Sequence, residues 1–292
     1  MSDSTRKKGK FPPWIRVRTG CGGSRNEVSQ ILTSLKLNTV CSSAMCPNLN
    51  ECWHRRTATF MIMGDACTRN CKFCAVKHSS TPLALEADEP ERIAEAAAKL
   101  ELKYVVVTSV TRDDLPDGGA AHFAAVIRAI RARLPETGIE VLTPDFNADR
   151  EALTTVLDAQ PTVFNHNVET VERLSTQIRS KANYRRSLEV LSMAREISKG
   201  TIPVKSGIMA GLGETDEEIV QTIKDLHAAG ARILTIGQYL PPSGAHWPLE
   251  RYAEPEKFEQ WRKLALEIGF EFVASAPMVR SSYNAGELLG KR

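Results

Sequence analysis

Three cysteines, Cys67, Cys71 and Cys74, lie within eight residues of the chain. Their intervals of four and three residues allow one loop to place three sulfurs around one corner of an iron–sulfur cubane, and soft thiolates favour such clusters. A four-iron cluster held by three cysteines has one iron without a protein ligand. The spacing therefore predicts a 4Fe–4S cluster whose open iron is available for chemistry.

The same spacing also allows two less reactive interpretations. A zinc site needs a fourth protein ligand, which His78 could supply. The three thiols could also be buried cysteines that happen to be close in sequence. Spacing alone leaves both alternatives open.

A second group of three cysteines, Cys41, Cys46 and Cys52, lies just upstream. The segment that contains them is too short and too rich in turn-forming residues to bury three cysteines merely as hydrophobic side chains. We therefore expect a second metal site that lacks one ligand. The alternative is a three-cysteine zinc site completed by His54.

The chain has seven cysteines, an odd number, and six of them fall in these two groups. Such a distribution does not indicate a disulfide framework and fits metal ligation in a reducing cytosol, so we expect a cytoplasmic protein. Cys21 lies among glycines and is interpreted as a spare thiol.

Composition and length exclude several classes of protein. The 292 residues can form one large α/β domain or two ordinary domains, and 42% hydrophobic and 25% charged residues are typical of a globular chain in water. A formal charge of +3 is too small to indicate a nucleic-acid partner. No apolar run reaches the roughly 18 residues of a membrane helix, and the polar N-terminus shows no secretory signal, so no membrane partner is expected.

From Thr59 to about Gly237, apolar β-prone runs alternate with helical patterns. Strand–helix repetition predicts an α/β fold with parallel strands and right-handed crossovers, and six units predict a partial (β/α)6 barrel. The expected strands are 59–64, 104–109, 139–143, 163–167, 203–209 and 233–237, with helices at 90–100, 120–134, 150–158, 187–199 and 215–229.

The remaining segments flank this barrel. A helix is expected from Asn26 to Leu37, another from Pro255 to Glu267, and a short extra strand from Glu271 to Ala274. The resulting division is an N-terminal arm and cluster-binding extension (1–58), a barrel (59–250), and a C-terminal helix and tail (251–292). In such barrels the loops after the strands form the active face, and the Cys67 loop follows the first strand.

Cys-x3-Cys-x2-Cys, with aromatic Phe73 before its last cysteine, resembles the signature of the radical S-adenosylmethionine enzymes. In those enzymes the open iron is chelated by the amino and carboxylate groups of the cofactor. The upstream Cys-x4-Cys-x5-Cys narrows the resemblance to the lipoyl synthase family, where it holds an auxiliary 4Fe–4S cluster. The fourth ligand there is a serine of an Arg-Ser-Ser-Tyr motif. This chain has that motif at 280–283, and the family pattern indicates Ser282, with Ser281 as the alternative.

The resemblance covers nearly the whole chain from Lys10 onward. It implies radical insertion of two sulfur atoms, taken from the auxiliary cluster, at C6 and C8 of an octanoyl chain on a lysine. The implied cofactors are two 4Fe–4S clusters and S-adenosylmethionine. The implied partners are an octanoylated lipoyl carrier (the glycine cleavage H protein or a dehydrogenase E2 lipoyl domain) and an electron donor such as flavodoxin or ferredoxin.

The resemblance also implies contacts to S-adenosylmethionine after the strands. Thr108 is expected near the cofactor's amino group, and Asn167 or Glu169 at a ribose hydroxyl, although loop capping is the alternative for these two. Glycines near the fifth strand allow close approach to the adenine. The expected contacts are Phe73, Thr108, Asn167, Glu169, Lys205, Gly207 and Gly211.

Several cations and acids near this face have no single interpretation. Lys205, Arg185 and Arg186 could each hold the cofactor carboxylate or be surface cations with apolar stems. Asp113 and Asp114 are interpreted as solvated loop acids rather than as cofactor ligands.

The first 20 residues carry six basic side chains and one acidic one, with Pro12-Pro13 excluding a helix between them. This basic arm, Arg6 to Arg18, is either a solvated tail or a clasp for an acidic carrier protein, with Trp14 holding it to the body.

Three other functions remain as alternatives. A methylthiotransferase would need an RNA-binding domain, for which no room remains after residue 240. The early cysteines and the serine motif argue against a biotin-synthase-like enzyme acting on a free small molecule. A two-cluster electron carrier would not need six strand–helix units.

Overall fold

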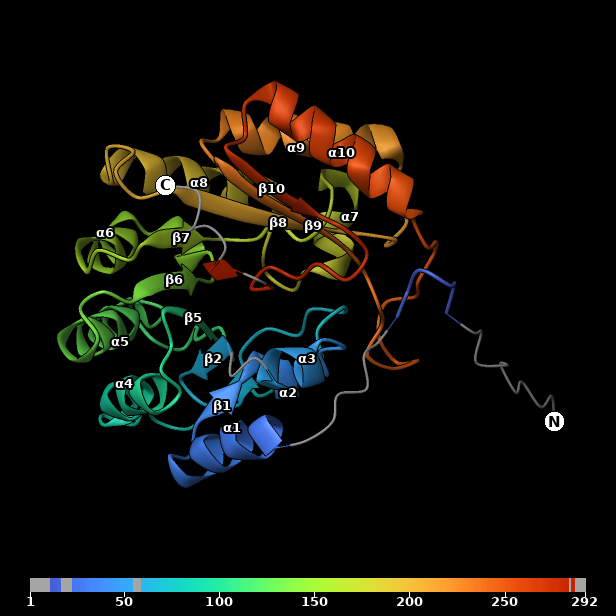
Figure 1. The fold of residues 1–292 in the computed structure, drawn as a ribbon. Coiled ribbons are helices and arrows are strands. Elements are labelled where there is room, and N and C mark those ends of the chain that lie inside the picture. Colours follow the sequence, from blue (N-terminus) through green and yellow to red (C-terminus); the bar gives the residue numbers. More distant parts are fainter. Residues whose placement is uncertain (1–10, 17–22, 55–58, 284, 287–292) are drawn as a thin grey trace.

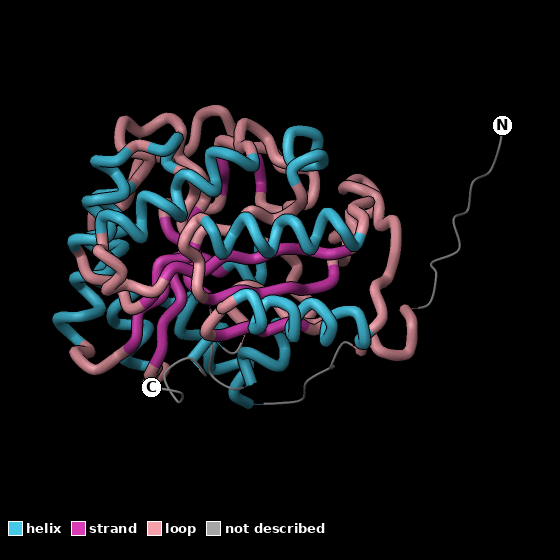
Figure 2. Tube along the Cα trace, turned by 90° about the horizontal axis from the view of Figure 1, so that it is seen from above, coloured by secondary structure: helices cyan, strands magenta, loops and turns pink. Residues whose placement is uncertain are grey.

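An eight-stranded sheet forms the centre of the molecule, and helices lie around its outer side (Figure 1). The computed structural model describes residues 11–16, 23–54, 59–283 and 285–286. The strand order is β1-β2-β5-β6-β7-β8-β9-β10, so the chain adds strands in sequence from one edge to the other. Viewed from above, helices flank the strands along their length (Figure 2).

All strands from β2 to β10 pair in parallel, which confirms the predicted α/β class and its six strand–helix units. The predicted extra strand also forms, and it lies beside β9. The bounds are β2 (Thr59–Ile62), β5 (Tyr104–Ser109), β6 (Gly138–Leu142), β7 (Val163–Asn165), β8 (Val204–Ala210), β9 (Ile233–Gln238) and β10 (Phe272–Ser275).

The crossover helices bury one apolar face against the sheet. In α5, for example, Phe123, Ile127 and Ile130 are fully buried. The helices are α4 (Glu89–Lys99), α5 (Ala120–Arg133), α6 (Arg150–Asp158), α7 (Glu172–Ile178), α8 (Tyr184–Ile197), α9 (Asp216–Ala228) and α10 (Pro255–Ile268).

Local capping explains where two of these helices begin. Thr215 and Glu218 form a capping box at the start of α9, close to the predicted start. The side chain of Asn183 accepts a hydrogen bond from the Arg186 amide, so α8 begins at Tyr184, three residues before the expected Ser187. The sequence did not predict α7.

The N-terminal elements lie at the β2 edge of the sheet (Figure 1). They are α1 (Gly23–Ser34), β1 (Asn38–Thr39), α2 (Val40–Ser43) and α3 (Leu49–His54). β1 is antiparallel to β2 and pairs Thr39 with Phe60, so the upstream cysteines begin directly beside the first strand of the barrel. Cys21 lies outside the described residues.

Three small elements lie among the loops. β3 (Ala66–Cys67) and β4 (Lys77–His78) form a parallel two-stranded sheet that spans the first cysteine loop. The short 3-10 helix η1 (Phe146–Ala148) follows β6.

After β10 the chain returns across the sheet to the N-terminal elements. The Asn48 amide donates to the Met278 carbonyl (2.8 Å), and the Tyr283 hydroxyl donates to Glu51 Oε1 (2.9 Å). Both predicted flanking segments thus contribute a strand to the central sheet and contact each other.

The short piece described in the basic arm contacts the C-terminal half. Ile15 is buried, and the rings of Phe11 and Tyr252 lie edge to face at 6.4 Å. Most of the arm, from Arg6 to Lys10 and including Arg18, lies outside the described residues. Within the part of the chain that is described, no helix has the length and apolar character needed to cross a membrane.

Candidate functional site

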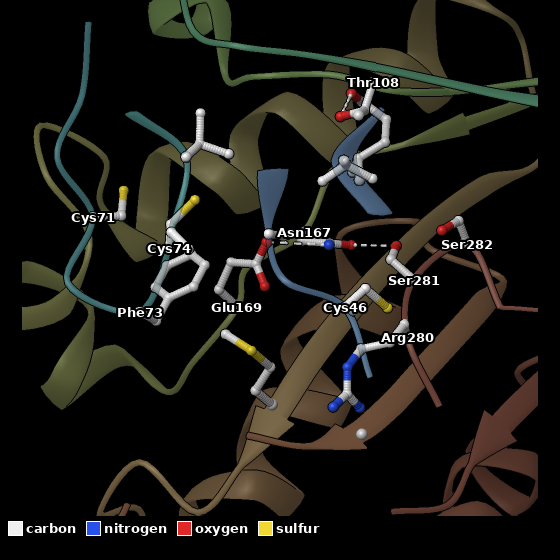
Figure 3. Close-up of a pocket in the computed structure, with 18 of the residues that line it drawn as sticks. Cys46, Cys71, Phe73, Cys74, Thr108, Asn167, Glu169, Arg280, Ser281 and Ser282 are labelled. Carbon is white, nitrogen blue, oxygen red and sulfur yellow. Dashed lines mark hydrogen bonds between the residues drawn. The ribbon is translucent and has the colours of Figure 1, made fainter. Parts of the chain in front are cut away.

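A cavity of about 380 Å³ at the carboxyl ends of the strands brings together residues from both cysteine groups. Cys67, Cys71 and Cys74 line it, and so do Cys41 and Cys46. In Figure 3, Cys71 and Cys74 lie on one side, Cys46 and Ser282 lie on the other, and Asn167 and Glu169 lie between them. The fold therefore places the two groups across a shared space, although the 14 residues 53–66 separate them in sequence.

An adjoining cavity of about 390 Å³ contains the whole upstream group. Cys41, Cys46 and Cys52 line it together with Ser282 and Thr59. The Thr59 hydroxyl donates to Ser282 Oγ at 2.9 Å. Ser282, from the C-terminal tail, therefore lies beside the three upstream cysteines.

The loop of the first cysteine group is held by backbone donors. The amides of Arg69 and Thr111 donate to Cys67 Sγ at 3.4 and 3.3 Å. Burial raises the pKa of Cys74 to about 12 and also raises that of Cys71. Metal binding must therefore displace protons from these thiols, as thiolate ligation generally does.

Arg69, inside this loop, forms two ion pairs that the sequence did not indicate. Its Nη2 lies 2.8 Å from Asp113 Oδ1 and 2.7 Å from Asp145 Oδ1, while Arg186 Nε lies 2.9 Å from Asp145 Oδ2. Burial alone would raise the pKa of Asp145, but hydrogen bonds and charge from Arg69 outweigh it and hold that pKa below its usual range.

This network corrects one sequence interpretation. Asp113 is not a solvated loop acid, because its side chain is only 16% exposed and pairs with Arg69; Asp114 pairs with Arg112. Arg69 thus connects the cysteine loop to the loops after β5 and β6.

Asn167 and Glu169 lie in the middle of the first cavity, which both cysteine groups share. Asn167 Nδ2 donates to Glu169 Oε1 at 3.1 Å (Figure 3). Burial raises the pKa of Glu169, whereas the positive charge of Arg179 lowers it. Arg179 also lines the cavity and donates to the Val168 carbonyl at 3.2 Å. Arg179 is a buried cation that the sequence analysis missed, because nothing in its local sequence indicates burial.

The five other predicted contacts divide into two sets. Phe73, Thr108 and Gly207 line the cavity, whereas Lys205 and Gly211 do not. Gly207 leaves room for neighbouring side chains, because a Cβ there would lie 2.8 Å from Asn167 Oδ1. Gly211 has φ of +105° and lies against the backbone at Arg251, so its conformation and packing both require glycine.

The predicted cations take other partners. Lys205 Nζ lies 2.7 Å from Glu140 Oε1, and both side chains are almost completely buried. Arg185 pairs with Glu172 on the surface, and neither Arg185 nor Arg186 lines the cavity.

His166 is a further cavity residue, from the stretch in which Asn167 was predicted. Its Nδ1 is 2.9 Å from the Thr143 carbonyl and its Nε2 is 2.9 Å from Ser187 Oγ. Burial, reinforced by the charge of Arg179, lowers the pKa of His166 to about 4. The imidazole is therefore neutral near pH 7.

These residues fit the cofactors that the sequence implies. The buried hydroxyls of Ser109 and Thr143 line the cavity shared by both cysteine groups without a hydrogen-bond partner among the described residues, so they are available to a polar ligand. Cys41, Cys46, Cys67, Cys71 and Cys74 are free thiols. Among the described residues, no three His, Cys, Asp or Glu side chains converge as they would around a single metal ion.

The comparisons with a family model and with related proteins agree on one family. The model of the radical SAM superfamily matches residues 61–226. The chain is 53% identical over 276 residues to "Lipoyl synthase" of Rubrobacter xylanophilus, covering 94% of this chain and 85% of that protein. It is 51% identical over 280 residues to "Lipoyl synthase" of Alkaliphilus metalliredigens, covering 96% of both.

Solved structures share the fold at low sequence identity. Methylornithine synthase (PylB) superimposes with a TM-score of 0.56 at 14% identity, covering 90% of this chain and 85% of that one. The hydrogenase maturase HydG of Carboxydothermus hydrogenoformans gives 0.56 at 13% identity, covering 91% and 78%.

Proposed function

This chain belongs to the lipoyl synthase family of the radical SAM superfamily, and we propose which of its residues perform each part of the reaction. The enzyme inserts two sulfur atoms, at C6 and C8, into an octanoyl chain carried on a lysine of a lipoyl carrier protein. It uses S-adenosylmethionine and two 4Fe–4S clusters. When bound, these groups supply a 5′-deoxyadenosyl radical for hydrogen removal and the sulfur for insertion.

For the first cluster we assign the ligands Cys67, Cys71 and Cys74. Their shared cavity, their free thiols and the ion pairs that fix their loop support the assignment. The residues proposed to contact S-adenosylmethionine line the same cavity: Phe73, Thr108, Asn167, Glu169 and Gly207.

Arg179 is the better candidate for a cation near the cofactor carboxylate. It lines the cavity, while Lys205 is paired with Glu140 beneath it. We propose that Lys205 and Gly211 support the cofactor site indirectly, through the packing of β8 and the loop that follows it.

For the auxiliary cluster we assign Cys41, Cys46, Cys52 and Ser282. Ser282 lies in the cavity that holds all three cysteines, which is the observation that carries this assignment. The neighbouring Ser281 already bonds to Asn165 and Asn167, which favours Ser282 over Ser281 as the ligand. A serine oxygen is a harder and weaker partner for iron than a thiolate, so Ser282 would leave one iron labile.

We further propose an octanoylated H protein or E2 lipoyl domain as the carrier, flavodoxin or ferredoxin as the reductant, and a cytoplasmic location. The carrier substrate follows from the family, and the five free thiols of Cys41, Cys46, Cys67, Cys71 and Cys74 support a reducing compartment. An apolar lining protects a carbon radical from side reactions; Val110, Leu142, Ile208 and Leu240 contribute to it.

The direct test is to reconstitute the protein without oxygen and mix it with S-adenosylmethionine, dithionite and an octanoyl-lysine peptide. Mass spectrometry should show two sulfur atoms added to the peptide, from protein that contains about eight irons per chain. A colourless zinc protein, or reduced clusters with an unchanged peptide, would indicate a structural protein or an electron carrier instead.

A substitution tests whether Ser282 makes one iron labile. Ser282→Cys should assemble both clusters but complete sulfur insertion at least about tenfold more slowly, because thiolate binds iron more firmly. Rapid-quench mass spectrometry of the peptide measures the rate, and cleavage of S-adenosylmethionine is the internal control. An undiminished rate for both insertions would contradict the hypothesis that Ser282 leaves one iron of the auxiliary cluster labile.

A further inference from the structure

A chain of buried hydrogen bonds runs across the barrel from Lys205 to the C-terminal tail. Lys205 Nζ donates to both oxygens of Glu140, at 2.7 and 3.0 Å, and the Tyr104 hydroxyl donates to Glu140 Oε2 at 3.0 Å. Asn165 Nδ2 donates to Glu140 Oε1 at 2.9 Å and to Ser281 Oγ at 2.8 Å. Side chains from β5, β7 and β8 therefore meet at Glu140 of β6, and Asn165 of β7 joins this cluster to the tail at Ser281.

The chemistry of these groups fixes the direction of each hydrogen bond. The Glu140 carboxylate, paired with Lys205, only accepts, so the Asn165 amide must turn its nitrogen and not its oxygen towards Glu140. The second hydrogen of that nitrogen then points to Ser281. The Ser281 hydroxyl in turn donates a hydrogen bond to Asn167 Oδ1 at 3.1 Å (Figure 3).

Burial makes this arrangement costly to disturb. Asn165 and Glu140 have no exposed surface, and Lys205 is 2% exposed. Separating a fully buried ion pair, or leaving its hydrogen-bonding groups without partners, is strongly unfavourable. Asn165 therefore has one preferred orientation, which presents a donor to the tail.

We propose that Asn165 is a positioning residue for the auxiliary cluster. Oriented by the Glu140–Lys205 pair, it holds Ser281 and thereby keeps the adjacent Ser282 at Cys41, Cys46 and Cys52. This inference rests on the proposed assignment of Ser282 as a ligand. It gives the buried pair a role in the sulfur-donating half of the site, across the barrel from the first cluster.

The test measures how fast the auxiliary cluster of the reconstituted holoenzyme loses iron to a chelator, with S-adenosylmethionine bound at the first cluster. A parallel preparation with Cys67, Cys71 and Cys74 changed to Ala identifies the auxiliary phase. Ser281→Ala and Asn165→Ala should each accelerate that phase about tenfold, as expected for outer-shell partners of a ligand. The double variant should be no faster than either single variant, because both remove the same contact.

Controls separate positioning from general damage. Ser34→Ala removes an exposed hydroxyl that donates to the Ile31 carbonyl within α1, and it should leave both phases unchanged. Ser281→Thr keeps the hydroxyl and should restore the slow phase. The first-cluster phase should stay unchanged in every variant, which a general loss of structure would not allow. If Asn165→Ala does not fold, Asn165→Asp keeps the side-chain size but replaces the donor with an acceptor.

Ser282→Ala distinguishes failure of this inference from failure of the assignment beneath it. If Ser282→Ala accelerates the auxiliary phase while Ser281→Ala and Asn165→Ala do not, the positioning role is wrong and the ligand assignment stands. Additive effects in the double variant would also refute the positioning role of Asn165 and Ser281. If Ser282→Ala leaves the auxiliary phase unchanged, Ser282 is not a ligand, and the positioning role fails with that assignment.

Discussion

Gly207 lies on β8 where the strand meets the cavity shared by both cysteine groups, and its missing side chain leaves space for Asn167. A Cβ there would lie 2.8 Å from Asn167 Oδ1 and 2.7 Å from Thr235 Oγ1. Gly207→Ala should therefore displace Asn167 and weaken the binding of S-adenosylmethionine about tenfold, in line with the cost of overpacking. Equilibrium dialysis of the reconstituted enzyme measures this affinity.

The matched control for that prediction is Gly244→Ala. A Cβ at Gly244 would meet no atom within 4 Å, so this variant should bind S-adenosylmethionine as the unchanged enzyme does. Equal affinities for both variants would mean that Asn167 does not contact the cofactor.

His166 makes the stability of the protein depend on pH. Its folded pKa of about 4 lies below the unfolded value of 6.5, so the unfolded chain binds the proton more readily between these values. Stability should therefore fall as pH decreases from 6.5 towards 4, by about 2 kcal/mol between pH 7 and pH 5. Asp145, also with a lowered pKa, adds to the loss only below its ordinary value of 3.8.

Urea unfolding of the cluster-free chain at pH 7 and pH 5 checks this prediction. His166→Gln should be less stable at both values, but it should lose about 2 kcal/mol less than the unchanged protein between them. The same pH dependence in both proteins would show that another group is responsible.

Single residues differ in how well their surroundings can be predicted from sequence. The cysteines predict a metal site because their type and spacing are local properties of the chain. The ion pairs of Arg69 could not be predicted in this way, because Asp113 and Asp145 lie 44 and 76 residues further on. Likewise, Lys205 has the same local sequence whether it faces a cofactor or Glu140.

At the scale of elements, the contact between β9 and the tail sets the position of Ser282. A Cβ at Gly237 would lie 2.1 Å from the Val279 carbonyl oxygen, so Gly237→Ala must push the tail backbone away from β9. The auxiliary cluster should then lose about one iron, while the first cluster keeps its four. Elemental analysis and the ratio of 5′-deoxyadenosine to sulfur-containing product check this.

That ratio should rise several-fold in Gly237→Ala, because radical formation continues while sulfur delivery is impaired. Gly244→Ala again serves as the control. A normal ratio with a full iron content would show that the tail tolerates displacement.

The repeating elements of the fold were predictable, whereas the return of the tail was not. Each strand–helix unit has its own hydrophobic period and turn, and the six expected strands all form. Three of the hydrogen bonds that hold the tail, from Asn48 to Met278, Thr59 to Ser282 and Tyr283 to Glu51, each span more than 200 residues. Such contacts leave no periodic signal. Only the resemblance to the lipoyl synthase family indicated where the serine would lie.

At the scale of the whole molecule, a protein-bound substrate must reach a cavity that lies at the ends of the strands. The described base of the basic arm lies beside the segment that borders this cavity. Phe11 packs on Tyr252, and Leu240 and Pro242 of the same connection line the cavity. Phe11 therefore lies beside this connection, and the sequence before it carries four basic side chains, Arg6, Lys7, Lys8 and Lys10, which we expect to attract an acidic carrier.

Deleting residues 1–10 tests whether these basic side chains recognise the carrier, and it leaves the contact between Phe11 and Tyr252 in place. Activity on an acidic octanoylated carrier protein should fall roughly tenfold at low salt, because charged surfaces accelerate the association of proteins. Activity on a short octanoyl-lysine peptide should change little, since the peptide presents no such surface. The difference should shrink as ionic strength rises and the charges are screened. Equal losses on both substrates would show that the arm supports the fold of the enzyme and does not recognise its carrier.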